Sequence, residues 1–172
     1  VLGGVLIFPG SSGSSITSGR ELWRSDGTIE GTVLVKDINP TGDGMFLITP
    51  FIEMGGFLYF LANDGVHGNE LWRTNGIPEG EPGAITEMVR DINPGAADGD
   101  PGRATSGSRV ENIVNLNGTL IFNADGGLHP DDQSGGNDVG LWRSDGTEAG
   151  TVLILDQPDT SASPPTHLTV FN

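Results

Sequence analysis

Four aspartates in one glycine-rich stretch are the residues of this sequence that could bind a metal ion. They are Asp125, Asp131, Asp132 and Asp138. Their carboxylate oxygens are hard ligands of the kind that Ca²⁺ prefers, although their spacing does not match the loop of an EF-hand. The stretch predicts a calcium site, with a solvated acidic loop as the alternative interpretation. Acidic groups at 98–100 and 63–70 are candidates of the same kind.

Residues that could perform catalysis form no recognisable constellation. His67, His129 and His167 show no zinc-binding spacing. The sequence has no G-x-S-x-G elbow and no glycine-rich phosphate loop followed by a helix. Paired carboxylates could still serve a glycoside hydrolase, since an acidic chain contains many of them. We expect a protein that is not an enzyme, with glycoside hydrolase as the remaining alternative.

The charge of the chain argues against several classes of partner. Eight lysines and arginines stand against 23 acidic residues, which gives a formal charge of −15. A protein must neutralise the phosphates of nucleic acids and anionic membranes with basic residues, so neither is an expected partner. No apolar run reaches the length of about 18 residues that a membrane span needs, and no membrane insertion is expected. There is no cysteine, so neither disulfides nor thiolate metal sites contribute. The chain begins at Val1 without a methionine, and we expect a mature or excerpted segment.

One phrase occurs three times along the chain. Residues 21–38 read ELWRSDGTIEGTVLVKDI, residues 70–92 read ELWRTNGIPEGEPGAITEMVRDI, and residues 141–156 read LWRSDGTEAGTVLILD. A period of about 50 residues is typical of repeat architectures. The whole chain contains 28 glycines and 11 prolines, and short β-prone runs lie between them, which predicts an all-β chain with many turns.

Seven residues of the repeated phrase are assigned to structure. They are Trp23, Trp72, Trp142, Asp26, Gly27, Asp145 and Gly146. Asp-Gly between two β-prone runs is a tight-turn signal, because glycine accepts positive φ and the carboxylate accepts backbone N–H groups. One tryptophan per repeat at one strand position predicts packing between repeats, with sugar-stacking platforms as the alternative. Each tryptophan precedes an arginine, and we expect these arginines to pair with repeated acids such as Asp37 and Asp91.

Each repeat resolves into short β-prone runs separated by turn residues. The expected strands are 4–8, 21–25 and 32–38 in the first repeat, 46–54, 57–63, 70–74 and 85–92 in the second, 109–116, 119–124, 140–144 and 151–156 in the third, and a terminal run at 167–172. Apolar residues are direct neighbours in these runs, so both faces of each sheet are expected to be buried. The run at 85–92 also shows helical spacing, but its alignment with the first repeat favours a strand.

The repeated phrase resembles the ELWxxDGT repeat of large secreted bacterial proteins. The lead-in FLYFLANDGVHGNELW is similar to that family as well, and the resemblance covers essentially the whole chain. It implies a propeller-like, extracellular or cell-surface protein, and it supplies no catalytic residues. The Asp-Gly turns also resemble the Asp-box of sialidase propellers, where the turn is structural. The sequence departs from the pattern at Asn75-Gly76, in the added 78–82, and in the long loops 96–108 and 126–139.

Small antiparallel sheets that recur at this period are typical of the blades of a β-propeller. We expect one all-β domain over 1–172. Its blades would comprise 1–45 with 167–172, 46–108, and 109–166.

The terminal run is expected to complete the first blade, either within the chain or between copies. It comprises His167, Leu168, Thr169, Val170 and Phe171. Three blades are too few to close a propeller, so we expect copies of the chain to associate through edge strands into a ring or a filament. The expected function is a non-catalytic structural or adhesive role outside the cell. The alternative is a calcium-assisted module that binds extracellular carbohydrate.

Overall fold

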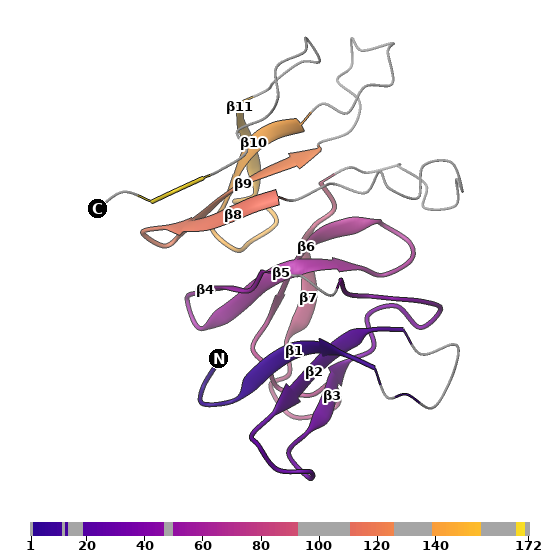
Figure 1. The fold of residues 1–172 in the computed structure, drawn as a ribbon. Coiled ribbons are helices and arrows are strands. Elements are labelled where there is room, and N and C mark those ends of the chain that lie inside the picture. The colour runs from indigo at the N-terminus through magenta and orange to yellow at the C-terminus, as the bar shows by residue number, and fades with distance from the viewer. Residues whose placement is uncertain are drawn as a thin grey trace.

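The chain folds into β-strands and turns. The computed structural model describes residues 2–11, 13, 19–46, 50–92, 111–125, 139–155 and 168–170. Within these residues there are eleven strands and no helix, hence none that could span a membrane. The strands form three antiparallel sheets, in which neighbours in the sequence are neighbours in space (Figure 1). The all-β prediction is confirmed.

The three sheets follow one another along the chain. The first sheet contains β1 (Leu6–Gly10), β2 (Glu21–Ser25) and β3 (Val33–Lys36). The second sheet contains β4 (Ile52–Met54), β5 (Phe57–Asn63), β6 (Asn69–Thr74) and β7 (Thr86–Arg90). The third sheet contains β8 (Glu111–Leu116), β9 (Thr119–Asp125), β10 (Val139–Ser144) and β11 (Val152–Leu155). All three sheets have a β-bulge between the leucine and the tryptophan of the repeated phrase. The repeats are therefore alike in register as well as in sequence.

Two-residue hairpin turns open both four-stranded sheets. Gly55 and Gly56 join β4 to β5 with φ of +60° and +81°, and Asn117 and Gly118 join β8 to β9 with φ of +52° and +84°. Two successive residues at positive φ make a turn whose twist matches that of the flanking strands, and Gly-Gly and Asn-Gly adopt it at little cost. Turn chemistry thus fixes the pairing of the first two strands in each of these sheets.

The expected fourth strand of the first sheet is not found among the described residues, and its completion between copies stays a prediction. The first sheet has three strands, and ahead of β1 there is only an isolated bridge between Leu2 and Val5. Leu168, Thr169 and Val170 form no strand, while His167 and Phe171 lie outside the described residues. Among the described residues no strand pairs with the outer edge of β1, so its main-chain groups have no strand partner there. In spite of the helical spacing at 85–92, Thr86–Arg90 form a strand, β7, as the repeat alignment predicted.

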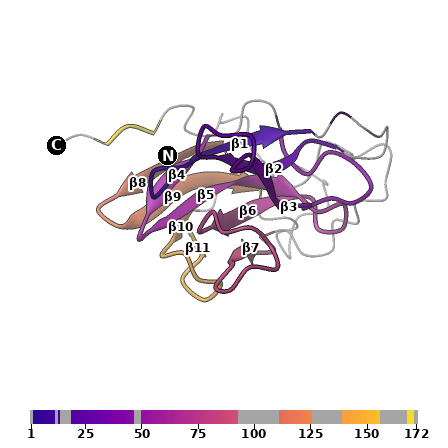
Figure 2. The same cartoon turned by 90° about the horizontal axis from the view of Figure 1, so that it is seen from below.

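The three sheets are stacked in chain order. Figure 1 shows the third sheet above the second and the second above the first, and the view from below in Figure 2 shows them overlapping. Side chains alternate between the two faces of a strand, so each sheet presents two different surfaces. We call the surface with the tryptophan of the repeat the Trp face, and the surface with the leucine before that tryptophan the Leu face.

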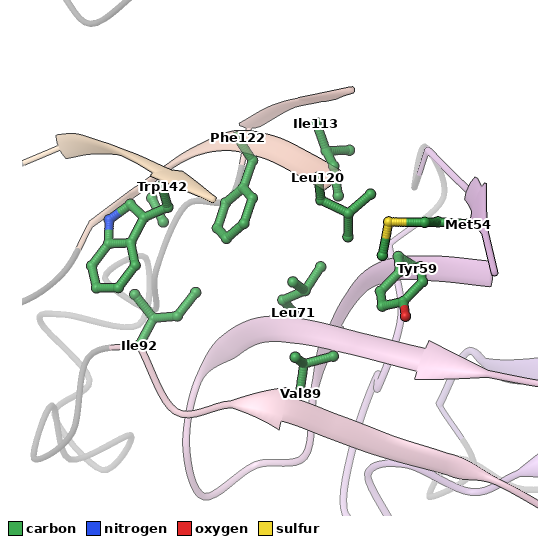
Figure 3. Packing of buried hydrophobic residues seen from close by; sticks show 10 residues of the cluster. Met54, Tyr59, Leu71, Val89, Ile92, Ile113, Leu120, Phe122 and Trp142 are labelled. Atoms are coloured by element: carbon green, nitrogen blue, oxygen red, sulfur yellow. The ribbon is translucent and has the colours of Figure 1, made fainter. Parts of the chain in front are cut away.

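Both inner interfaces pair a Trp face with a Leu face. The Trp face of the second sheet packs on the Leu face of the first. The Trp face of the third sheet packs on the Leu face of the second, as Figure 3 shows. The buried residues are Ile7, Leu22 and Val35 against Leu58, Phe60, Ala62 and Trp72 at the first interface, and Tyr59, Leu71 and Val89 against Leu120, Phe122, Ala124 and Trp142 at the second. The same positions of the repeat therefore build both halves of the core.

Among the described sheets, only the second has another sheet packed on each of its faces. Its successive residues Leu58, Tyr59 and Phe60 are at most 4% exposed. Each outer sheet has one face on which no described strand packs, and there Leu6 is 53% exposed and Ile154 is 48% exposed. The prediction that every sheet is buried on both faces is wrong for the first and third sheets, because each of them has a neighbouring sheet on one side alone.

Candidate functional site

The predicted calcium ligands lie at the limit of the described structure. Asp125 is the last residue of β9, and its side chain is not among those described. Asp131, Asp132 and Asp138, and the acidic group at 98–100, lie outside the described residues. Among the residues that the structure does describe, no group of three acidic or histidine side chains could hold a metal ion. The calcium site stays a prediction.

The acidic group at 63–70 has a local role. Asp64 Oδ1 accepts the N–H groups of Val66 and His67 at 2.9 and 2.8 Å, and its Oδ2 lies 2.7 Å from His67 Nδ1. Burial acts to raise the pKa of Asp64, but these hydrogen bonds outweigh it, so the pKa lies below its ordinary value. The hydrogen bond to Asp64 raises the pKa of His67. The carboxylate is occupied in holding its own loop between β5 and β6.

The two Asp-Gly turns make the same set of hydrogen bonds. Asp145 Oδ1 accepts the backbone N–H of Thr147 at 2.9 Å and its hydroxyl at 2.7 Å. The Thr147 hydroxyl oxygen in turn accepts the N–H of Gly150 at 3.0 Å. A Cβ on Gly150 would lie 2.0 Å from the carboxylate, so this position accepts glycine alone. Asp26 makes the same bonds in the first sheet, to Thr28 at 2.9 and 2.7 Å.

The second sheet keeps this turn with different residues. Asn75 stands where the aspartate stands in the other repeats, and its Oδ1 accepts the N–H groups of Ile77 at 3.2 Å and Ile85 at 3.1 Å. Its amide donates to the carbonyl of Gly83 at 2.7 Å. The amide therefore spans the longer loop created by the insertion, which a carboxylate could not do because it has no donor.

Asp145→Asn should make stability less dependent on pH under acidic conditions. The hydrogen bonds from the Thr147 hydroxyl and N–H hold the pKa of Asp145 below its ordinary 3.8. A lowered pKa gives stability that is present above the ordinary value and is lost as the pH falls through the lowered one. Melting of both proteins between about pH 7 and pH 2 should show the parent losing its advantage over Asp145→Asn in that acidic range. A constant difference at every pH would contradict this assignment.

Two of the three repeated tryptophans lie at the interfaces between sheets. Trp72 and Trp142 are 6% and 7% exposed, within the first and second interfaces respectively. Neither offers an open ring for a sugar to stack on. Trp23 is half-buried on the Trp face of the first sheet, beside Phe8 in register. It occupies the position that packing between sheets uses elsewhere, but on an outer face.

The expected acidic partners Asp37 and Asp91 are wrong for Arg24 and Arg73: Arg73 pairs with Glu87 of its own sheet, and both arginines donate to backbone carbonyls of the following sheet. Arg24 Nη1 donates to the carbonyl of Gly76 at 3.1 Å, and Arg73 Nη1 donates to the carbonyl of Gly146 at 2.9 Å. Each arginine thus reaches the turn glycine of the next sheet in the chain. A planar guanidinium satisfies a turn carbonyl that no strand partner reaches, which fixes one sheet against the next.

A second basic position makes the same kind of connection at the edge of the stack. Lys36 at the end of β3 forms an ion pair with Glu79, which lies in the insertion of the second sheet. Arg90, at the matching end of β7, donates to the carbonyls of Glu148 at 3.3 Å and Thr151 at 3.1 Å in the third sheet. These contacts also run from each sheet to the turn of the following one.

Sequence reasoning missed the glutamate that begins the repeated phrase. Glu21 is 4% exposed, and its carboxylate accepts the N–H groups of Ile38 at 2.7 Å, Gly44 at 2.9 Å and Asn39 at 3.3 Å. Glu70 in the second sheet accepts the N–H of Ile92 at 3.0 Å. The signal was its place directly before Leu-Trp in two repeats.

Comparisons with protein-family models, with curated proteins and with solved structures found no match. The class that the geometry itself defines is a stack of small antiparallel sheets held together by repeated turns, tryptophans and arginines.

Proposed function

We propose that this protein is a non-catalytic structural or adhesive protein of the bacterial cell surface or exterior, and that copies of it associate with one another. Its three sheets act as blades of a propeller-like array. The observation that carries the proposal is that the repeated residues serve cohesion between sheets, while the two outer faces of the stack leave apolar side chains exposed.

The contacts of the repeated phrase support this role. Its aspartates close turns, Trp72 and Trp142 pack between sheets, and Arg24 and Arg73 bind the neighbouring turn. Residues used in this way build a surface that can be extended by further sheets. The ELWxxDGT resemblance and the strongly acidic composition agree with a location outside the cell.

The mass of the purified chain in solution tests self-association. Light scattering across a concentration series should give multiples of the chain mass of 17.9 kDa, with rings or fibres visible by negative-stain imaging. A chain that stays monomeric at every concentration would contradict the proposal. Repeating the series with calcium and with a chelator decides whether calcium takes part, and a glycan-array signal would favour the carbohydrate-binding alternative instead.

A further inference from the structure

The two outer faces of the stack are the two halves of its inner interface. The first sheet leaves its Trp face open, with Leu6, Phe8 and Trp23 on it, and the third sheet leaves its Leu face open, with Ile121, Leu141 and Ile154 on it. Inside the chain, a Trp face always packs on a Leu face. The two outer faces of the described stack are therefore complementary in type.

Burial at matched positions shows what each open face lacks. Leu58 and Leu120, which match Leu6 in the repeat, are 4% and 0% exposed, whereas Leu6 is 53% exposed. On the other face, Val35 and Val89 are 1% and 6% exposed, whereas the matching Ile154 is 48% exposed. Apolar side chains that are buried by a neighbouring sheet elsewhere in the repeat favour the same kind of neighbour here.

The arginine contacts give the missing interface a direction. Arg24 binds the turn of the second sheet and Arg73 binds the turn of the third, and both inner turns touch the preceding sheet. A Cβ on Gly76 would lie 3.1 Å from Ile7, and one on Gly146 would lie 2.1 Å from the Tyr59 hydroxyl. Around Gly27 in the first sheet, by contrast, there is open space.

The third arginine completes the series. Arg143 follows Trp142 as the other two follow their tryptophans, and it is exposed on the open Leu face. Ile121, at the strand position of Ile7 and Tyr59, is half-buried beside it in register. Within the described part of the chain, Arg143 therefore has no turn carbonyl of a following sheet to bind, and the turn at Gly27 has no arginine of a preceding sheet.

We propose that the Leu face of the third sheet packs on the Trp face of the first sheet of a second copy, head to tail. Arg143 then donates to the carbonyl of Gly27 of that copy, and Ile121 packs beneath its turn. This rests on the self-association proposed above and names the surfaces that perform it. The contact is heterologous, so it produces a ring if the rotation closes and a filament if it does not.

The edge of this contact differs in one respect from the inner interfaces. Leu155 stands where Lys36 and Arg90 reach the next turn, and it is 49% exposed. Ile29, at the tip of the open turn, is 90% exposed. It occupies the position of Glu148, whose backbone carbonyl accepts a hydrogen bond from Arg90. The basic contact within the chain becomes an apolar pair, Leu155 with Ile29, between copies. Association should therefore not weaken as salt is raised, since salt leaves apolar contacts in place and screens the repulsion between chains that each carry a formal charge of −15.

Two single variants and their mixture test the proposal. Ile154→Asp blocks the Leu face and Leu6→Asp blocks the Trp face, and each should raise the dissociation constant at least about a hundredfold by placing a charge in an apolar contact. Each variant alone should therefore be monomeric by light scattering. Mixed in equal amounts they should form a heterodimer that grows no further, because one intact Leu face then meets one intact Trp face.

A matched control and a second variant test whether the loss of association is specific to the proposed contact. Val66→Asp places the same charge at a loop position that is 65% exposed, and it should associate like the parent. Arg143→Glu should weaken association about tenfold or more by removing a charged hydrogen bond, while circular dichroism stays that of the folded parent.

The outcomes separate this inference from the proposed function. Single variants that associate as the parent does would overturn the face-to-face contact while leaving self-association through edge strands standing. A mixture that stays monomeric would also overturn it. A parent chain that is monomeric at every concentration would overturn both proposals together.

Discussion

Gly146→Ala should destabilise the protein by about 3–5 kcal/mol, and Gly27→Ala by only about 1–2 kcal/mol. The two glycines occupy the same position of the same turn sequence, with φ of +90° and +94°. Both variants therefore meet the same backbone strain. Only Gly146 lies against another sheet, where the new methyl group would be 2.1 Å from the hydroxyl of the buried Tyr59.

Urea unfolding of the two variants measures this difference directly. Tyr59→Phe removes the hydroxyl, so the extra cost of Gly146→Ala should shrink in that background, and the double-mutant cycle isolates the contact. Equal destabilisation by the two alanines in the parent would mean that the turn of the third sheet does not pack on the second.

Glu21→Ala should lower the free energy of unfolding by about 2–5 kcal/mol, because it leaves buried backbone N–H groups without an acceptor. The carboxylate holds the segment after β3 against β2 through Ile38, Asn39 and Gly44. Glu30→Ala, at an exposed acidic position of the same repeat, is the control and should stay within about 0.5 kcal/mol of the parent. Similar losses in both variants would contradict the role of Glu21.

The contribution of Glu21 to the free energy of unfolding should depend on pH. Burial raises the pKa of Glu21 above its ordinary 4.5, although the three N–H donors act to lower it. A raised pKa means that its contribution is fully present below the ordinary value and is lost as the pH rises through the raised one. Stability of the parent relative to Glu21→Gln should therefore fall as the pH rises from about 4 toward neutrality.

The repeated phrase made the strands predictable because strand and turn chemistry are local. β5 falls on the predicted 57–63, and β7 is a strand in spite of its helical spacing. The positions of the Asp-Gly turns could be predicted because aspartate followed by glycine strongly favours a turn.

The contacts between sheets could not be predicted in the same way. Arg24 and Arg73 bind backbone carbonyls of the following sheet, and every residue has such a carbonyl, so no acidic partner in the sequence marks the target. Similarly, alternating apolar residues look alike in the inner and outer sheets, and whether Ile154 is covered depends on the stack rather than on the strand.

In the third sheet, a glycine replaces the glutamate of the repeated phrase, and the packing of the next strand explains the replacement. Gly140 stands where Glu21 and Glu70 stand in the other sheets, and a Cβ there would lie 2.3 Å from Leu153 and 3.0 Å from the carbonyl of Leu155. The strand that follows therefore approaches closely, and the sequence after it lacks the Ile-Asn pair whose N–H groups the glutamate of the first sheet accepts.

Cross-linking between two single-cysteine chains would test the head-to-tail contact most directly. The parent has no cysteine, and Ile29 and Leu155 are exposed positions that the proposed contact brings together. A mixture of Ile29→Cys and Leu155→Cys chains, treated with a short bismaleimide, should yield a product of two chains containing one of each. Leu155→Cys mixed with Val66→Cys is the control. Equal cross-linking in the two mixtures, or none in the first, would contradict the contact between the open faces of neighbouring copies.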